Sequence, residues 1–115
     1  MKVKRYELKP NTTIKDLLKC GAIEDRNFLY IDKFVEVKNS DIRIRLSFTS
    51  DVNKWNDVGG VEVFNTDSGQ SCRLFYKYRD SGEDAESGLI EYLISEYNIF
   101  MDSLPIMIST KSKKK

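Results

Sequence analysis

The sequence contains no histidine, which removes the most common general base and the most common metal ligand of proteins. A serine or cysteine nucleophile therefore has no imidazole partner to activate it. Glycine-rich phosphate loops are also missing, since no Gly-x-Gly-x-x-Gly or Gly-Lys-Ser sequence occurs and Gly59-Gly60 precedes a predicted strand rather than a helix. We therefore expect neither an enzyme nor a protein with a cofactor.

Cysteines and long apolar runs are equally scarce. The two cysteines, Cys20 and Cys72, are fewer than a small disulfide-stapled secreted domain normally carries. They fit a reducing compartment, in which thiols pack as small apolar groups. No apolar run has the length of a signal peptide or of a membrane-spanning helix. These absences predict a cytoplasmic protein that does not interact with a membrane.

What is present suffices for one hydrophobic core. The chain has 115 residues, of which 40% are hydrophobic and 32% charged, and its mean hydropathy is −0.48. This size and composition fit a single folded domain, which we place over residues 1–108. Lysines crowd the remaining residues, 109–115, where a disordered basic tail is predicted.

The charges are unevenly distributed, although the net charge is only +1. Residues 1–50 carry eleven Lys/Arg and seven Asp/Glu, a net +4, whereas residues 51–110 carry four and eleven, a net −7. Four further lysines lie in residues 111–115. The chain is thus polarised in sequence, and its fold decides whether it is also polarised in space.

Two helices are predicted. The first is short and begins after Thr13, where Thr13 and Asp16 have the spacing of a capping box, and Gly21 suits its C-terminal end. The second covers about residues 84–103, because apolar side chains recur there every three or four positions.

The remaining apolar segments predict an antiparallel sheet. In the clearest of them Ile42, Ile44, Leu46 and Phe48 alternate with polar residues, which indicates one buried and one solvent-facing side. Strands are predicted over residues 3–8, 27–37, 42–49, 61–64 and 72–76, and residues 106–108 either form a final strand or simply pack. The sequence therefore predicts an α+β fold, an antiparallel sheet of four to five strands packed by one long C-terminal helix, with a short N-terminal helix.

Carboxylates in the predicted loops do not have the spacing of a metal site. Asp51, Asp57 and Asp67 are interpreted as turn formers. The acidic run at residues 80–86 does not match the ligand spacing of an EF-hand loop. No metal ion is expected.

Residues 80–102 contain seven acidic residues and no lysine or arginine. Exposed helices normally mix both signs, so an unbroken acidic face would suit a basic groove on another protein. The alternative is a solvated face whose first acids favour the helix dipole. Trp55, in a polar loop, is either a lid on the core or an exposed interface anchor. The residues predicted to bind a partner are Glu83, Asp84, Glu86, Glu91, Glu96 and Trp55.

Nucleic-acid binding is the second interpretation. Arg43 and Arg45 lie on the polar side of their strand, and Phe28 and Tyr30 lie on the neighbouring strand. Basic side chains beside aromatic rings on an open sheet suit a single strand of nucleic acid, although an ordinary solvated strand face has the same composition. The residues assigned to this function are Arg43, Arg45, Lys2, Lys4 and Arg5.

The layout of these elements resembles a known group of proteins. It combines the Thr-x-x-Asp-Leu-Leu helix ending at Gly21, a strand pair, the segment Val61–Asp67 turning back into Leu74-Phe75-Tyr76, and the C-terminal Leu89-Ile90-Glu91-Tyr92-Leu93. Over about residues 11–104 it resembles the small accessory and anti-defence proteins, anti-CRISPR proteins among them, of phages and prophages of Gram-positive bacteria. The resemblance implies a binder in the cytoplasm of a bacterial host and assigns no functional residue.

Three hypotheses remain from the sequence. The first is a non-catalytic protein-binding module that inhibits or modulates a host protein, such as a CRISPR nuclease, through the acidic helix. The second is a small nucleic-acid-binding protein that uses the basic sheet face and the termini. The third is a structural subunit that associates with itself through a sheet edge or the helix.

Overall fold

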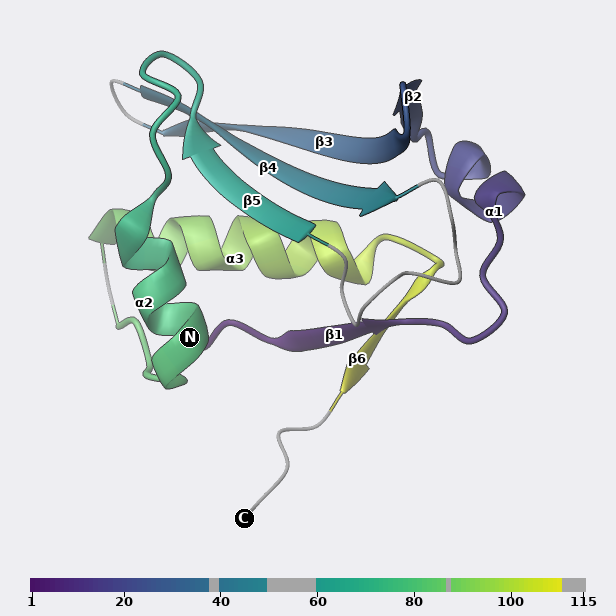
Figure 1. Cartoon of the computed structure of the whole chain (residues 1–115). Coiled ribbons are helices and arrows are strands. Elements are labelled where there is room, and N and C mark those ends of the chain that lie inside the picture. The colour runs from purple at the N-terminus through teal and green to yellow at the C-terminus, as the bar shows by residue number, and fades with distance from the viewer. Residues whose placement is uncertain (38–39, 50–59, 87, 111–115) are drawn as a thin grey trace.

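A four-stranded antiparallel sheet forms the upper layer of the molecule (Figure 1). The structure is a computed structural model that describes residues 1–37, 40–49, 60–86 and 88–110. The strands follow the order β2-β3-β4-β5 across the sheet, so each pairs with its neighbour in the chain. Their bounds are Ile23–Asp25 for β2, Phe28–Val37 for β3, Ser40–Thr49 for β4 and Gly60–Asn65 for β5. The α+β class and the antiparallel sheet are confirmed.

In the hairpin of β3 and β4, the buried side of β4 is the one that the alternation predicts. Ile42, Ile44, Leu46 and Phe48 all lie in the core, and the intervening side chains of β4 lie on the opposite side of the sheet. On β3, Leu29, Ile31 and Val35 are buried in the same way. The sheet therefore has an inner side, packed on the core, and an outer side.

A second, two-stranded sheet joins the two ends of the chain. β1, Arg5–Leu8, pairs antiparallel with β6, Met107–Thr110. The C-terminal apolar segment thus forms a strand, one of the two outcomes left open by the sequence. Ser109 and Thr110, the first two residues of the predicted disordered tail, belong to β6, so the prediction is wrong for them. The rest of the predicted tail, residues 111–115, lies outside the described residues.

Helix α1, Ile14–Lys19, is capped as predicted. The Asp16 amide donates to the Thr13 hydroxyl oxygen at 3.3 Å, and the Thr13 amide donates to the Asp16 carboxylate at 3.0 Å. That second hydrogen bond lowers the pKa of Asp16. Leu17 is fully buried and anchors this short helix to the core.

The predicted fourth strand over residues 72–76 is wrong, because these residues begin helix α2, Arg73–Ser81. In the helix, Phe75 is fully buried and its ring centre lies 4.9 Å from that of Tyr97. Gly82 has φ 73° and ends the helix. The aromatic composition favours a strand locally, but packing on the core decides the outcome.

Helix α3, Gly88–Asp102, begins four residues later than predicted. The preceding segment pairs with the N-terminus, since the Met1 amine donates to the Ala85 carbonyl at 2.8 Å and the Ala85 amide donates to the Met1 carbonyl at 2.9 Å. Ala85 is buried as part of the core, but it is not helical.

Helices α3 and α2 lie beneath the sheet and the β1–β6 pair lies beneath α3, in place of the single long helix that the sequence predicts. Figure 1 shows α3 running below the sheet with α2 beside it and the β1–β6 pair underneath. Tyr97 of α3 is the meeting point, because its ring packs edge-on against Phe75 of α2 and Tyr6 of β1. Burial raises the pKa of Tyr97 to about 12. No helix in the described part of the chain is long and apolar enough to cross a membrane.

Candidate functional site

The seven acidic residues predicted to form one helical face are divided among three segments. Asp80 belongs to α2, whereas Glu83, Asp84 and Glu86 lie between α2 and α3. Only three of the seven, Glu91, Glu96 and Asp102, are on α3, whereas the predicted helix over about residues 84–103 would contain five. The prediction of one unbroken acidic helix face is therefore wrong, because the helix starts at Gly88.

Four of these acids have a basic partner in the fold. Three of the partners, the Met1 amine, Lys4 and Lys33, are distant in the sequence, so no local pattern predicts these pairs, whereas Arg79 directly precedes Asp80. The ion pairs are Asp84 with the Met1 amine at 3.1 Å, Glu96 with Lys33 at 3.4 Å, Asp102 with Lys4 at 3.0 Å and Asp80 with Arg79 at 3.0 Å. Of the predicted partner-binding acids, Glu83, Glu86 and Glu91 have no ion pair within the described residues, and Glu83 and Glu86 are exposed.

The basic residues assigned to nucleic-acid binding are not brought together. Lys2, Lys4 and Arg5 lie on the N-terminal segment, which is fastened to α3 by Asn98. The Asn98 side-chain amide donates to the Lys2 carbonyl at 2.9 Å, and its oxygen accepts from the Lys4 amide at 3.1 Å. Arg43 and Arg45 lie on β4 in the other sheet, on the far side of α3 (Figure 1).

The outer side of the four-stranded sheet gathers aromatic rings around these two arginines. Phe34 of β3 and Phe64 of β5 both stand opposite Arg43 of β4 in the strand register. Arg45, also on β4, stands opposite Asp32 of β3 and Glu62 of β5. The pairing of three strands therefore places each arginine between a residue of β3 and a residue of β5.

Each guanidinium lies over an aromatic ring. The guanidinium carbon of Arg43 is 4.2 Å from the centre of the Phe34 ring, and that of Arg45 is 4.2 Å from the centre of the Tyr30 ring. Both are also within 6 Å of the Phe64 ring centre, at 5.9 and 5.8 Å. These distances fit cation–π stacking, which holds the arginines flat on the sheet.

Asp32 holds both arginines from one position between them. Its carboxylate accepts two hydrogen bonds from Arg45, from Nε at 2.8 Å and from Nη2 at 3.3 Å. Nη1 of Arg43 lies 3.7 Å from the same carboxylate. The hydrogen bond from Arg45 to Asp32 is the largest cause that raises the pKa of Arg45. The two guanidiniums are therefore oriented and partly neutralised before any partner arrives.

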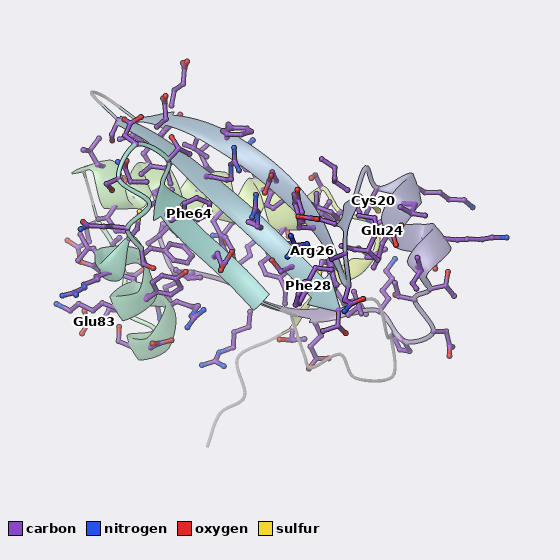
Figure 2. The ribbon with its side chains drawn as sticks, turned by 45° about the horizontal axis from the view of Figure 1, so that its top comes forward. Cys20, Glu24, Arg26, Phe28, Phe64 and Glu83 are labelled. Carbon is purple, nitrogen blue, oxygen red and sulfur yellow. The ribbon has the colours of Figure 1, made fainter. Side chains whose placement is uncertain are left out.

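Large apolar side chains stand exposed around this cluster. Phe28 is 53% exposed, Phe34 59% and Ile23 55%. Figure 2, with the top of the molecule turned forward, shows Phe28 and Phe64 on this side of the sheet together with Arg26. We name this surface the outer aromatic face and define it by Ile23, Phe28, Tyr30, Asp32, Phe34, Arg43, Arg45 and Phe64.

Sequence reasoning finds only part of this face. Arg43, Arg45, Phe28 and Tyr30 are recognised as neighbours from their strands, whereas Phe34, Asp32, Ile23 and Phe64 are missed. The available signal is the period of two in β3, which places Phe28, Tyr30, Asp32 and Phe34 together opposite the buried Leu29 and Ile31. Trp55 lies outside the described residues.

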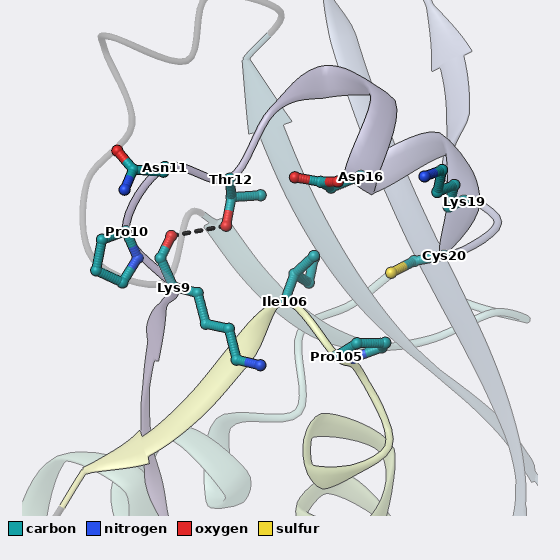
Figure 3. A pocket seen from close by; sticks show the side chains of 9 residues that line it. All are labelled: Lys9, Pro10, Asn11, Thr12, Asp16, Lys19, Cys20, Pro105 and Ile106. Carbon is teal, nitrogen blue, oxygen red and sulfur yellow. Dashed lines mark hydrogen bonds between the residues drawn. The ribbon is translucent and has the colours of Figure 1, made fainter.

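A hollow of about 330 Å³ lies between α1 and the start of β6 (Figure 3). Lys9, Lys19, Cys20 and Ile106 line it. Burial raises the pKa of the Cys20 thiol, which keeps it protonated and unreactive at neutral pH. Asp16, also at the wall, already accepts the Thr13 amide. The hollow therefore holds no arranged nucleophile.

Groups of three or more residues able to hold a metal ion are absent from the described part of the chain.

Comparison of the chain with protein-family models, curated proteins and solved structures finds no match. The outer aromatic face brings together two arginines, each stacked on an aromatic ring, and three large apolar side chains that are more than half exposed.

Proposed function

We propose that this chain is a non-catalytic protein-binding module and that the outer aromatic face is its binding surface. One observation carries the proposal: three large apolar side chains, each more than half exposed, surround two arginines stacked on aromatic rings. Contiguous exposed apolar patches on soluble proteins mark interaction sites. Aromatic residues and arginine are also the residue types that carry most binding energy at protein interfaces.

The arrangement of charge favours a protein over a single strand of nucleic acid. Phosphate binding needs free positive charge along a groove. Here Asp32 accepts two hydrogen bonds from Arg45 and lies 3.7 Å from Nη1 of Arg43, so its charge offsets part of the positive charge of the two guanidiniums. The remaining basic candidates, Lys2, Lys4 and Arg5, lie at or just before β1 of the other sheet.

A bacterial host protein is the partner that the resemblance implies, and a nuclease with a basic nucleic-acid groove is one such partner. Glu83, Asp84, Glu86, Glu91 and Glu96 remain a second proposed contact surface. Their support is weaker because Asp84 and Glu96 already have basic partners within the fold. Glu83, Glu86 and Glu91 are left to contact a partner there.

The test is affinity capture from host cell extract with matched variants. The double variant Phe28→Ser with Phe34→Ser removes the apolar centre of the outer aromatic face. Its control, Leu89→Ser with Ile99→Ser, removes two similarly exposed apolar side chains from α3. We expect the captured protein to be lost with the first pair and retained with the second.

The same experiment separates the two proposed surfaces. Glu83→Lys with Glu86→Lys reverses two exposed charges that have no ion pair within the described residues, and it leaves the outer aromatic face unchanged. Loss of the captured protein with this pair, and its retention when Phe28 and Phe34 are serine, would reject the outer aromatic face and return the function to the acidic residues.

A further inference from the structure

We infer that the outer aromatic face receives a basic amphipathic α-helix from its partner. This rests on the proposed function and deepens it by stating the chemistry and the shape of the partner. Aromatic rings and the two arginines occupy the centre of the face, exposed apolar side chains lie around them, and carboxylates stand toward its margins. An element with an apolar stripe and flanking lysines or arginines complements both features.

Four carboxylates surround the aromatic centre. The alternation of the strands places them on the outer side of the sheet, where all four are exposed. They are Asp25 on β2, Glu36 on β3, Asp41 on β4 and Glu62 on β5. Among the described residues, none of them forms an ion pair. Glu62 stands opposite Arg45 in the register and contributes to the raised pKa of that arginine. Uncompensated negative charge therefore lies toward the rim at Asp25, Glu36 and Asp41, while the two arginines at the centre share Asp32.

The net charge of the outer side indicates which sign of charge a partner should carry. The outer positions carry five acids, the four at the rim and Asp32, against Arg43 and Arg45, a net −3. Arg26, at the adjacent turn, lowers the excess to −2. A negatively charged ligand is repelled by such a surface. So is the same face of a second copy, because it brings an equal excess of negative charge.

The dimensions of the face fit one helix. Phe28 and Phe34 are six residues apart on β3, which corresponds to roughly 20 Å along the strand. A helix of about 13 residues has this length. Three strand spacings give a width of roughly 14 Å, which is slightly more than the diameter of a helix with its side chains. Helices laid into apolar grooves or faces are a recurring mode of peptide recognition.

The test uses a defined probe and amide NMR spectra of the full chain. The probe is a synthetic 14-residue helical peptide of leucine and lysine, and its control replaces each lysine by glutamate. We expect the lysine peptide to shift amide signals along β3, β4 and β5, and the glutamate peptide to leave them unchanged. Shifts confined to residues 83–86 or to α3 would overturn the inference.

Charge reversal supplies the quantitative test. Glu36→Lys with Glu62→Lys should weaken binding of the lysine peptide at least fivefold. Glu83→Lys with Glu86→Lys changes the net charge equally away from the face and should weaken it less than twofold. If the two double variants weaken peptide binding equally, only the net charge of the protein matters and the inference is wrong. Phe34→Ser should also weaken binding of the lysine peptide at least fivefold.

The other occupants are distinct outcomes of the same spectra. Shifts at the face with a 15-mer of deoxythymidine would assign it to nucleic acid, and shifts that depend on protein concentration alone would assign it to a second copy. Each would overturn the inference. If the captured host protein depends on Phe28 and Phe34 but not on Glu36 and Glu62, the proposed function stands and only the basic helix is rejected.

Discussion

At the scale of single residues, Asp32 organises the candidate site. It is the one carboxylate in hydrogen-bonding contact with Arg45, and it lies near Arg43 as well. Its side chain is only 14% exposed, so the ion pairs are screened less than surface pairs are. Asp32 therefore contributes to stability as well as to the shape of the face.

Replacing Asp32 by Asn removes the charge but keeps the size of the side chain. We expect the free energy of unfolding to fall by about 1 to 2 kcal/mol, since hydrogen bonds to charged groups contribute this much. Urea unfolding measures the change. Glu36→Gln, on the same strand and side but without an ion pair in the described residues, is the control and should change stability by less than about 0.5 kcal/mol. Equal effects of the two changes would refute this role of Asp32.

Arg26 has a backbone conformation that its side chain does not favour. Its φ is 60°, in the left-handed region, at the turn between β2 and β3. Asparagine tolerates this conformation better than arginine does. Arg26→Asn should therefore raise the free energy of unfolding by about 0.5 to 1 kcal/mol, measured by urea unfolding. Arg26→Val, which cannot adopt the conformation easily, should lower it, and the reverse order would contradict the structure.

Tyr97 makes the fold sensitive to alkaline pH. Burial raises its pKa to about 12, above the value near 10 expected in the unfolded chain. When the pKa of a group is higher in the folded chain than in the unfolded chain, the group stabilises the fold at every pH below its unfolded-state pKa. This stabilisation is lost as the pH rises through the pKa of the folded state. Stability should therefore fall between about pH 10 and 12.

Urea midpoints across that range measure this loss. The Tyr97→Phe variant should show a smaller decline than the original chain, whereas Tyr92→Phe, at an exposed position of α3, should not change the decline. A decline that is identical in all three chains would assign the alkaline sensitivity to other groups.

At the scale of elements, the sequence predicts best where local chemistry and tertiary packing agree. The capping box of α1 and the alternation of β4 are both local signals, and both are confirmed. In α2 the local signal and the tertiary packing disagree. The aromatic residues favour a strand, but Phe75 packs into the core as part of a helix. The start of α3 depends on hydrogen bonds to Met1, which lies far away in the sequence.

The candidate site shows the same limit. Period-two alternation is enough to place Phe34 beside Phe28 and Tyr30 on one side of β3. The contact between Phe34 and Arg43 depends on how β3 and β4 are aligned. The position of the Phe64 ring near Arg43 depends on how β4 and β5 are aligned. These alignments are non-local, so the sequence yields the members of the face but not their assembly.

The end of α2 offers a test of the corrected assignment. Gly82 has φ 73°, so Gly82→Ala should lower the free energy of unfolding by about 1 kcal/mol. At Gly60 the new Cβ would meet only the Ser47 Cβ at 3.7 Å and φ is not positive, so Gly60→Ala should be close to neutral. Urea unfolding compares the two. A neutral Gly82→Ala would contradict the left-handed end of the helix.

At the scale of the whole molecule, the edges of the sheet are protected while its outer side is open. At the β5 edge, the Tyr76 hydroxyl oxygen accepts from the Val63 amide at 2.9 Å, and the Cys72 amide donates to the Val63 carbonyl at 2.9 Å. On β3, Lys33 points inward and pairs with Glu96 of α3. Because β2 pairs only with residues 28–30 of β3, the rest of that side of β3 has no strand partner among the described residues, and an inward-pointing charge there opposes pairing with another chain.

These protected edges predict a monomer and so argue against the hypothesis of a self-associating subunit. Sedimentation across a wide concentration range should give one species of constant mass. Lys33→Val removes the inward charge and should introduce association that depends on concentration. A dimer of the original chain that persists on dilution would contradict the prediction.

The central claim, that the outer aromatic face binds another protein, is tested most directly by photo-crosslinking inside the host cell. A benzoylphenylalanine at position 34 places the reactive group on the face, and one at position 99 places it on α3, where Ile99 has similar exposure, 55% against 59% for Phe34. The account predicts a covalent adduct with a host protein from position 34 and none from position 99. An adduct from position 99, with none from position 34, would contradict it.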